Sequence, residues 1–124
     1  MSDRKELFPV WLDLSDKKIF VIGTMPEIRQ ILKALECCCG TLIWIVDQDM
    51  EEPCFAEVPE HVQIKQKPYE REDLLDADLV FCGTKDQQTA EDISAACRCL
   101  GIPVYLSGNA SKSSFCLRLE ENES

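Results

Sequence analysis

The sequence lacks features that several large classes of protein require. None of its apolar runs approaches the roughly 18 residues that a transmembrane helix needs, and its start, Met1–Glu6, is too polar for a signal peptide. We therefore expect a cytoplasmic protein with no membrane partner. Basic residues are scarce, because 13 Lys and Arg stand against 23 Asp and Glu, which gives a net charge of −10. That charge repels a phosphate backbone, so we expect no nucleic-acid partner either.

Patterns typical of metal sites are also missing. The eight cysteines include the run Cys37–Cys39 and the pair Cys97 and Cys99, but neither group has the C-x₂-C spacing that lets two sulfurs converge on one ion. We expect reduced cysteines that pack as small apolar residues or lie exposed, and His61, the only histidine, at the surface. The sequence thus predicts no metal site, and a thiol-based metal or redox protein is the weakest alternative.

The sequence does contain enough apolar material for one packed domain. Its 124 residues are 45% hydrophobic and 29% charged, which excludes disordered and collagen-like chains. A chain of this length fits one domain of ordinary size. We expect that domain over residues 1–119, followed by an acidic tail over residues 120–124.

Short apolar runs, rich in β-branched residues, predict the strands of a largely buried sheet. The predicted buried strands cover residues 18–23, 41–47, 79–84 and 103–106. Two further runs alternate apolar and polar residues, which favours strands nearer a sheet edge, and they cover residues 62–67 and 115–119. Because helical patterns separate the strands, we expect an α/β protein with a Rossmann-like, doubly wound, mostly parallel sheet in a single domain.

Helical spacing and capping residues predict two helices between these strands. The first is expected from Pro26 to Leu35, with Gly40 closing it, and the second from Asp86 to Leu100, with Gly101 closing it. One or two helical turns are expected at 71–77. In the second helix the residues expected to face inward are Ile93, Ala96, Cys97 and Leu100.

The turn between the first strand and the first helix is the expected ligand site, because doubly wound sheets bind ligands at the carboxyl ends of their strands. A dinucleotide motif places G-x-G-x-x-G there, so that backbone N–H groups can approach the pyrophosphate. This chain keeps only the first glycine, Gly23, while Met25 and Ile28 stand at the other two glycine positions. Glu27 adds a carboxylate near the phosphates, so the motif for pyrophosphate is weak.

Asp47 ends the second buried strand, at the position of the acid that bonds the ribose 2′-OH in NAD-dependent proteins. Alternatively it only ends the strand and caps the next turn, and the sequence leaves both interpretations open. As a ribose ligand Asp47 would disfavour a 2′-phosphate, so the expected cofactor is NAD rather than NADP. The predicted cofactor-binding residues are Gly23, Thr24, Met25, Pro26, Glu27, Asp47, Gln48, Asp49 and Thr84.

Three segments carry a resemblance to a known family: Phe8–Leu14 (FPVWLDL), Tyr69–Leu74 (YEREDL) and Ser114–Phe115, each at a set place relative to the strands. With them, the chain from about Phe8 to Leu119 resembles the NAD-binding N-terminal domain of the precorrin-2 dehydrogenase and sirohydrochlorin ferrochelatase family, the enzymes of sirohaem synthesis. The resemblance implies NAD-dependent oxidation of precorrin-2 to sirohydrochlorin, with iron insertion at the same cleft in some members.

The chain departs from that family at three places. Family members carry three glycines where this chain has Gly23, Thr24 and Met25, and a Thr-Asp-Asp type segment where it has Thr84, Lys85 and Asp86. The family's catalytic aspartate follows the fifth strand, and the matching stretch here holds Gly108 and Asn109 and no carboxylate. Because an amide cannot take a proton as a general base, we predict no catalytic residue.

Two functional hypotheses remain. The first is an NAD-binding domain like that of precorrin-2 dehydrogenase, which need not catalyse the reaction by itself. The second is a noncatalytic relative that binds a tetrapyrrole or a partner protein of the haem or sirohaem pathway. Family members dimerise through a helical second half, and the resemblance implies that this chain lacks it. A homodimer is still possible from the sequence. The net charge of −10 opposes the binding of NAD phosphates or a polycarboxylate tetrapyrrole. We expect Lys65, Lys67 and Lys85 to offset this repulsion locally.

Overall fold

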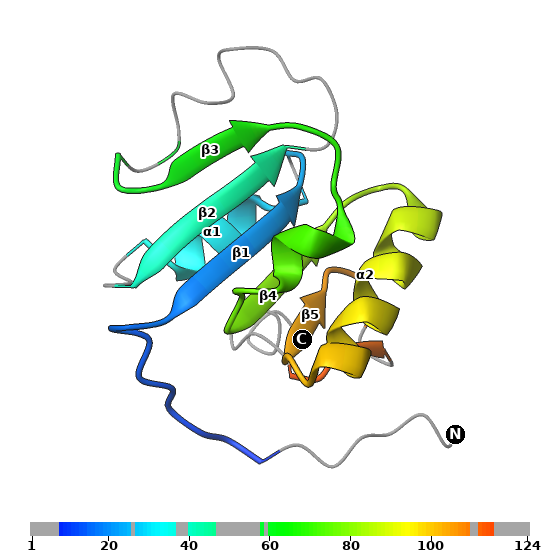
Figure 1. Cartoon of the computed structure of the whole chain (residues 1–124). Helices are drawn as coiled ribbons and strands as arrows, with labels where there is room; N and C mark the ends of the chain where they lie inside the picture. Colours follow the sequence, from blue (N-terminus) through cyan, green and yellow to red (C-terminus); the bar gives the residue numbers. More distant parts are fainter. Residues whose placement is uncertain are drawn as a thin grey trace.

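The computed structural model describes residues 8–25, 27–36, 40–46, 58, 60–109 and 112–115. Its centre is a sheet of five parallel strands in the order β3-β2-β1-β4-β5 (Figure 1). The strands are β1 (Lys18–Gly23), β2 (Thr41–Val46), β3 (Gln63–Gln66), β4 (Leu79–Gly83) and β5 (Val104–Leu106). The predicted Rossmann-like parallel sheet is therefore confirmed, and β3 lies at an edge as expected.

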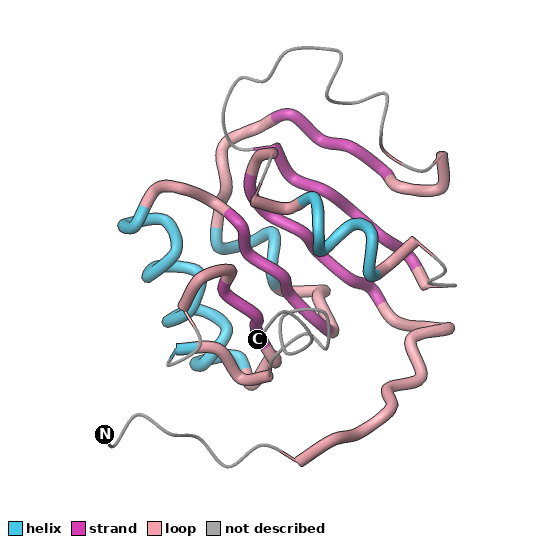
Figure 2. The backbone as a smooth tube through the Cα atoms, turned by 180° about the vertical axis from the view of Figure 1, so that it is seen from behind, coloured by secondary structure: helices cyan, strands magenta, loops and turns pink. Residues whose placement is uncertain are grey.

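Helices cover both faces of this sheet. Helix α1 (Arg29–Ala34) lies on one face, and the 3-10 helix η2 (Arg71–Leu74) and helix α2 (Gln87–Leu100) lie on the other (Figures 1 and 2). Among the described residues no helix has both the length and the apolar character needed to cross a membrane. The chain thus forms three layers with an apolar core on each side of the sheet.

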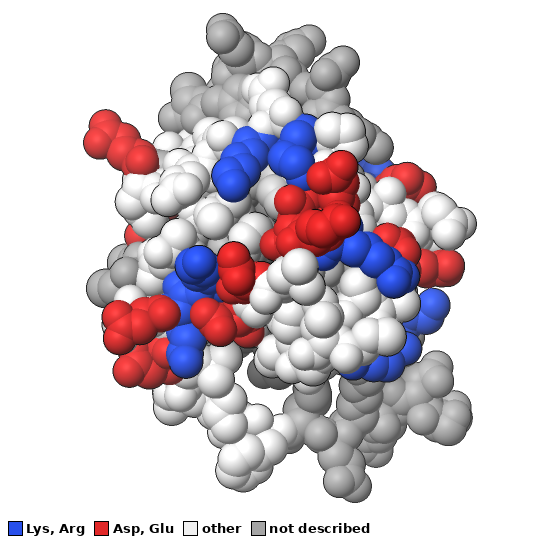
Figure 3. Space-filling view, in the orientation of Figure 1, with Lys and Arg blue, Asp and Glu red and all other residues white. Residues whose placement is uncertain are grey.

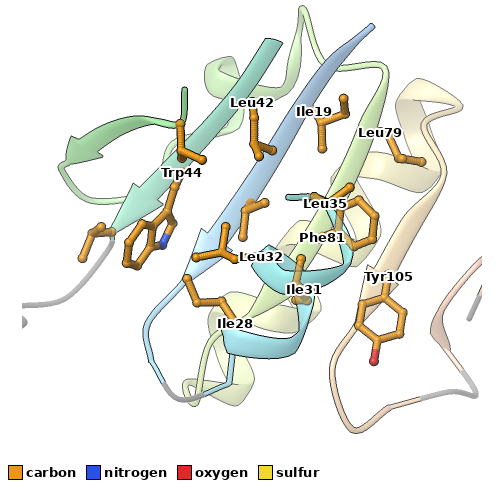
Figure 4. Packing of buried hydrophobic residues seen from close by; sticks show 13 residues of the cluster. Ile19, Ile28, Ile31, Leu32, Leu35, Leu42, Trp44, Leu79, Phe81 and Tyr105 are labelled. Atoms are coloured by element: carbon orange, nitrogen blue, oxygen red, sulfur yellow. The ribbon is translucent and has the colours of Figure 1, made fainter. Parts of the chain in front are cut away.

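The apolar runs of the sequence are explained by burial on both sides of the sheet. In β1 and β2 every residue after the first is buried. Since successive side chains of a strand point to opposite faces, Ile19 and Val21 join the α1-side core while Phe20 and Ile22 join the α2-side core. Figure 4 shows the α1-side core, where side chains of the first helical segment lie over those of β1, β2 and β4.

The strand order creates a switch point between β1 and β4. From β1 the chain proceeds to β2 and β3 on one side, and from β4 it proceeds to β5 on the other. The two connections leave the carboxyl ends of β1 and β4 in opposite directions, which is where open α/β sheets bind their ligands. The fold therefore directs attention to the residues that end these two strands.

The first helix differs from the prediction. It spans only Arg29–Ala34 and ends at a cap on Leu35, so the predicted closing role of Gly40 is wrong. A Cβ on Gly40 would lie 2.2 Å from the carbonyl oxygen of Leu14, because the chain that leads into β1 crosses it there. Gly40 is thus required by a contact between distant segments rather than by the end of a helix.

The second helix follows the prediction at both ends but not along its whole face. The Asp86 side chain accepts a hydrogen bond from the backbone N–H of Gln88, and Gly101 ends the helix with φ of 74°. Ile93, Ala96 and Cys97 are buried as expected, whereas Leu100, expected to face inward, is 45% exposed. Leu100 lies in the last turn of α2, where it lines an open groove beside η2 instead of the core.

The predicted last strand at 115–119 is not confirmed. Phe115 lies outside any strand, and residues 116–119 fall outside the described part of the chain. The preceding residues attach to β5 through hydrogen bonds: the Ser114 N–H donates to the Val104 carbonyl at 2.7 Å, and the Leu106 N–H donates to Ser113 Oγ at 2.8 Å. Phe115 then packs edge-on against Phe81, with ring centroids 5.4 Å apart.

Gly83, the last residue of β4, determines how closely the first helical segment approaches the sheet. A Cβ on Gly83 would lie 2.7 Å from Cγ2 of Ile28 and 3.2 Å from the carbonyl carbon of Glu27. Ile28 is fully buried at the N-cap of α1. The large residue at the third position of the glycine motif is therefore accommodated by a glycine on the neighbouring strand.

We predict that Gly83→Ala lowers the free energy of unfolding by about 1–3 kcal/mol, because the added methyl group overpacks a buried site. In an Ile28→Ala background, which removes the contacted Cγ2, the same substitution should cost less. Urea denaturation of the four proteins of this double-mutant cycle measures the coupling. Equal costs in both backgrounds would contradict the packing proposed here.

Candidate functional site

The candidate site begins where β1 and β4 end side by side. Gly23 and Gly83 are partners in the parallel register, and Gly23 has φ of 142°, a conformation that favours glycine. A Cβ on Gly23 would lie 2.5 Å from the carbonyl carbon of Gly83 and 2.8 Å from the backbone nitrogen of Thr84. The first glycine of the motif thus lets the two strand ends approach each other as the chain turns away.

Trp44 holds this turn from the side of β2. Its indole Nε1 donates a hydrogen bond of 2.9 Å to the carbonyl oxygen of Gly23, and the side chain is fully buried. The carbonyl that ends β1 is therefore satisfied inside the protein, and the turn is tied to both neighbouring strands. Trp44 also places an indole next to the candidate site, where it can report on a ligand.

The residues after Gly23 turn inward rather than outward. Thr24 is 5% exposed, and its carbonyl accepts a hydrogen bond of 3.3 Å from the N–H of Ile28. Met25, expected to stand where phosphates approach, is half-buried and packs against the α1-side core. The Met25 side chain, at the second glycine position of the motif, is thus partly turned toward the core and away from the place expected for the phosphates.

Glu27 is the unusual residue of the turn. Its Oε1 is buried and has no hydrogen-bond partner among the residues that the structure describes, although the residue as a whole is only half-buried. A buried carboxylate oxygen without a donor is costly, since it has given up water and gained nothing in return. The turn therefore offers an acceptor that fits a ligand with a hydroxyl or amine donor better than one that presents only phosphate.

The segment after β4 contributes polar groups that are already engaged. Thr84 is half-buried at the edge, and its Oγ1 accepts a hydrogen bond of 3.2 Å from the Asp86 N–H. Asp86 in turn caps α2 and accepts from the Thr89 hydroxyl at 2.7 Å. Asp86 thus serves the helix, while Thr84 lies next to Gly23 at the end of β4, and its part in binding stays a prediction.

The segment after β5 forms a tight turn at the same edge of the sheet. Gly108 has φ of 76°, the Asn109 N–H donates to the Leu106 carbonyl at 3.1 Å, and the Asn109 carbonyl accepts from the Ser113 hydroxyl at 2.9 Å. Residues 107–109 are Ser, Gly and Asn, so this turn brings no carboxylate to the edge. The backbone of Asn109 stabilises the turn.

Several predicted residues cannot be located or have other roles. Pro26, Asp47, Gln48 and Asp49 lie outside the described residues, so their part in binding stays a prediction. Lys67, one of the lysines expected to offset the negative charge, is engaged by the carboxylates of Glu70 and Asp73 and by the Pro68 carbonyl. It joins the end of β3 to η2.

Two features of the site were not found from the sequence. The first is the close approach of Gly83 to Gly23. Each glycine is the last residue of its strand, and this common place in the sequence could have indicated that the two strand ends meet. The unpartnered oxygen of Glu27 has no counterpart in the sequence pattern, because it depends on which groups the fold brings near.

The cysteines of the described residues are either packed in the core or exposed. No group of three or more possible ligands gathers among the residues that the structure describes. Cys82 and Cys97 are buried in the α2-side core, as the sequence predicts, and Cys99 is exposed. Burial, with a smaller effect from Cys82, raises the pKa of the Cys97 thiol to about 12, so this sulfur stays protonated and unreactive in the folded protein.

The other cysteines, Cys37–Cys39, Cys54 and Cys116, fall outside the described residues. The single histidine, His61, is exposed as expected.

We predict that iodoacetamide at mildly alkaline pH alkylates Cys99 in the native protein and leaves Cys82 and Cys97 unmodified, because alkylation needs an accessible thiolate. Peptide mass spectrometry before and after addition of urea measures the pattern. All three should react once the chain is unfolded. Rapid alkylation of Cys97 in the native protein would contradict its burial.

Comparison with known proteins identifies relatives of this fold. The sequence matches a family described as "Putative NAD(P)-binding" over residues 10–118. No curated protein matches the sequence. Among solved structures, SirC, a precorrin-2 dehydrogenase, has a TM-score of 0.57 at 21% identity, and the match covers 77% of this chain and 45% of SirC.

A second solved structure, the PH0520 protein from Pyrococcus horikoshii OT3, has a TM-score of 0.52 at 19% identity, and the match covers 80% of this chain and 28% of that protein. The chain therefore spans less than half the length of either protein, and at these identities the likeness concerns the fold. The family resemblance inferred from the sequence is confirmed. Because the family match runs over nearly the whole chain, the protein belongs to this NAD(P)-binding family, and its fold is similar to that of part of SirC.

Proposed function

We propose that this domain binds NAD at the carboxyl ends of β1 and β4, beside Gly23 and Glu27. Membership of the NAD(P)-binding family supports the cofactor. The observation that carries the proposal for these residues is the glycine turn at the switch point, next to a buried acceptor that lacks a donor. Ligands of doubly wound domains bind at this position.

The residues of the turn fit NAD through its hydroxyl groups. A ribose hydroxyl is a donor, so it can satisfy the buried Oε1 of Glu27, whereas a phosphate cannot. The half-buried Thr84 supplies a second polar group at the same edge. When bound, NAD would supply the hydride acceptor for oxidation of a substrate. The protein's own contribution is to orient the cofactor through this turn.

The choice of NAD over NADP rests on Asp47, which follows the last residue of β2 in the sequence. A carboxylate at this position bonds the ribose 2′-OH and repels a 2′-phosphate. Gln48 and Asp49 are proposed to lie near the same ribose. A cytoplasmic location remains a prediction from the sequence.

For activity, the family resemblance implies oxidation of precorrin-2 to sirohydrochlorin, and SirC is a precorrin-2 dehydrogenase. A second candidate function is binding of a tetrapyrrole, or of a partner protein of its pathway, without catalysis. The turn after β5 favours this candidate, because it holds Ser107, Gly108 and Asn109 where the resemblance implies a catalytic aspartate. Incubation with precorrin-2 and NAD, followed by NADH absorbance, separates the two: turnover comparable to a complete enzyme refutes the noncatalytic candidate.

We predict that Glu27→Leu weakens NAD binding by about 10- to 100-fold, the worth of a hydrogen bond to a charged group. The same substitution should raise the free energy of unfolding, because it replaces an unpartnered buried oxygen by an apolar side chain of similar size. Fluorescence of Trp44, in a Trp11→Phe background that leaves one indole, measures binding, and urea denaturation measures stability.

The matched control is Asp76→Asn, which removes one negative charge from an exposed side chain at the opposite edge of the sheet. It should change NAD affinity little. Absence of saturable quenching by millimolar NAD in the unsubstituted domain would refute the cofactor proposal. Unchanged affinity in Glu27→Leu would refute only the role of Glu27.

A further inference from the structure

Glu27 lies on the β4 side of the turn that follows β1. A Cβ on Gly83, the last residue of β4, would lie 3.3 Å from the Cβ of Glu27 and 3.2 Å from its carbonyl carbon. Ile28, the next residue, is fully buried against the same glycine, which fixes this part of the backbone. The Glu27 side chain therefore starts beside the end of β4, and its Oε1 is buried with no partner in the described part of the chain.

The two sides of the switch point receive different halves of a dinucleotide. A doubly wound domain binds one mononucleotide on each side of the crevice, with the pyrophosphate at the first turn. The acid that bonds the adenosine ribose follows the second strand, as Asp47 follows β2 here, so the adenosine half belongs to the β2 side. The nicotinamide half then belongs to the side of β4 and β5. Glu27 is thus on the nicotinamide side.

The two redox forms of NAD differ only in that half. The nicotinamide ring carries a positive charge in NAD⁺ and no charge in NADH, whereas the adenosine, both riboses and the pyrophosphate are the same in the two forms. Repulsion between Glu27 and the phosphates therefore acts on both forms and cancels in the ratio of their dissociation constants. The attraction between a carboxylate and the ring charge does not cancel.

We propose that Glu27 makes this site prefer the oxidised cofactor, NAD⁺, over NADH. The inference rests on the proposed NAD site, and it concerns binding alone, so it applies to a catalytic and to a noncatalytic domain. On this side of the turn, the ribose hydroxyl that can satisfy Oε1 belongs to the ribose that bears the nicotinamide ring. The hydrogen bond and the charge attraction therefore favour the same placement, and the site releases NADH more readily than NAD⁺.

Other charged groups contribute less to this preference, because water and salt screen them. The net charge of the chain is −10, but Figure 3 shows acidic and basic side chains close together on the surface of one face. Lys85, which follows Thr84 and whose charge would oppose that of the ring, is exposed. The Glu27 oxygen is buried, and a charge acts more strongly where the effective dielectric constant is lower.

We expect the unsubstituted domain to bind NAD⁺ about 10-fold more tightly than NADH, which one added charge pair at an intermediate dielectric constant supplies. Tighter binding of the oxidised form makes the bound cofactor harder to reduce, by about 30 mV for a 10-fold ratio in a two-electron couple. Glu27→Gln keeps the size and an acceptor oxygen but removes the charge, so the ratio should fall to about 1.

Isothermal titration calorimetry of the whole chain with NAD⁺ and with NADH measures both dissociation constants for each variant. Glu27→Asp keeps the charge, so it should keep the preference even where both forms bind more weakly. The matched control, Asp76→Asn, removes one charge from an exposed side chain at the opposite edge of the sheet and should leave the ratio unchanged. Circular dichroism checks that each variant is folded.

Salt separates the effect of Glu27 from that of the general charge of the chain. At about 1 M salt the Debye length is about 3 Å, so a preference caused by distant surface charges should disappear, whereas one caused by the buried Glu27 oxygen should persist. This measurement needs only the unsubstituted chain, so it decides the question even where Glu27→Gln does not fold.

The outcomes distinguish this inference from the NAD site itself. Equal dissociation constants for the two forms, an unchanged ratio in Glu27→Gln, or a preference lost in Asp76→Asn or at high salt overturns the role of Glu27 and leaves the NAD site standing. Absence of binding by both forms at millimolar concentration refutes the proposed NAD site, and this inference with it.

Discussion

The approach of β1 to β4 at Gly23 and Gly83 is the contact on which the rest of the domain depends. A Cβ on Gly23 would collide with the backbone of Gly83 and Thr84, and a Cβ on Gly83 would collide with Ile28 and press against Glu27. Because Gly83 has no side chain, Ile28 can bury itself against the strand and hold the first helical segment on the sheet. The glycines that end the two strands thus serve the packing of the protein as well as the approach of a ligand.

The same contact explains how the turn after β1 can form although the glycine motif is degenerate. Of the three glycines in the motif, the first makes the turn, and it is present as Gly23. The close helix packing normally allowed by the third is achieved by Gly83 from the other strand. Glu27, placed beside this contact, carries an oxygen that lacks a donor.

Local signals in the sequence were reliable where a single segment determines the outcome. Asp86 and Gly101 cap α2 through bonds within a few residues, so both ends of that helix were predicted correctly. Gly40 and Leu100 were interpreted wrongly from equally plausible local patterns. Gly40 faces a segment near residue 14, and Leu100 faces a groove beside η2, and neither neighbour is visible in the helical spacing.

The sequence by itself determined the buried strands, the α/β class and the position of the first turn, because apolar runs, helix caps and glycine act over a few residues. Only the tertiary structure decided that Gly83 stands opposite Gly23, that Trp44 bonds the end of β1, and that no donor from the described part of the chain reaches Oε1 of Glu27. These facts depend on segments that are far apart in the chain. Their distances and their burial exist only once the sheet and its helices have packed together.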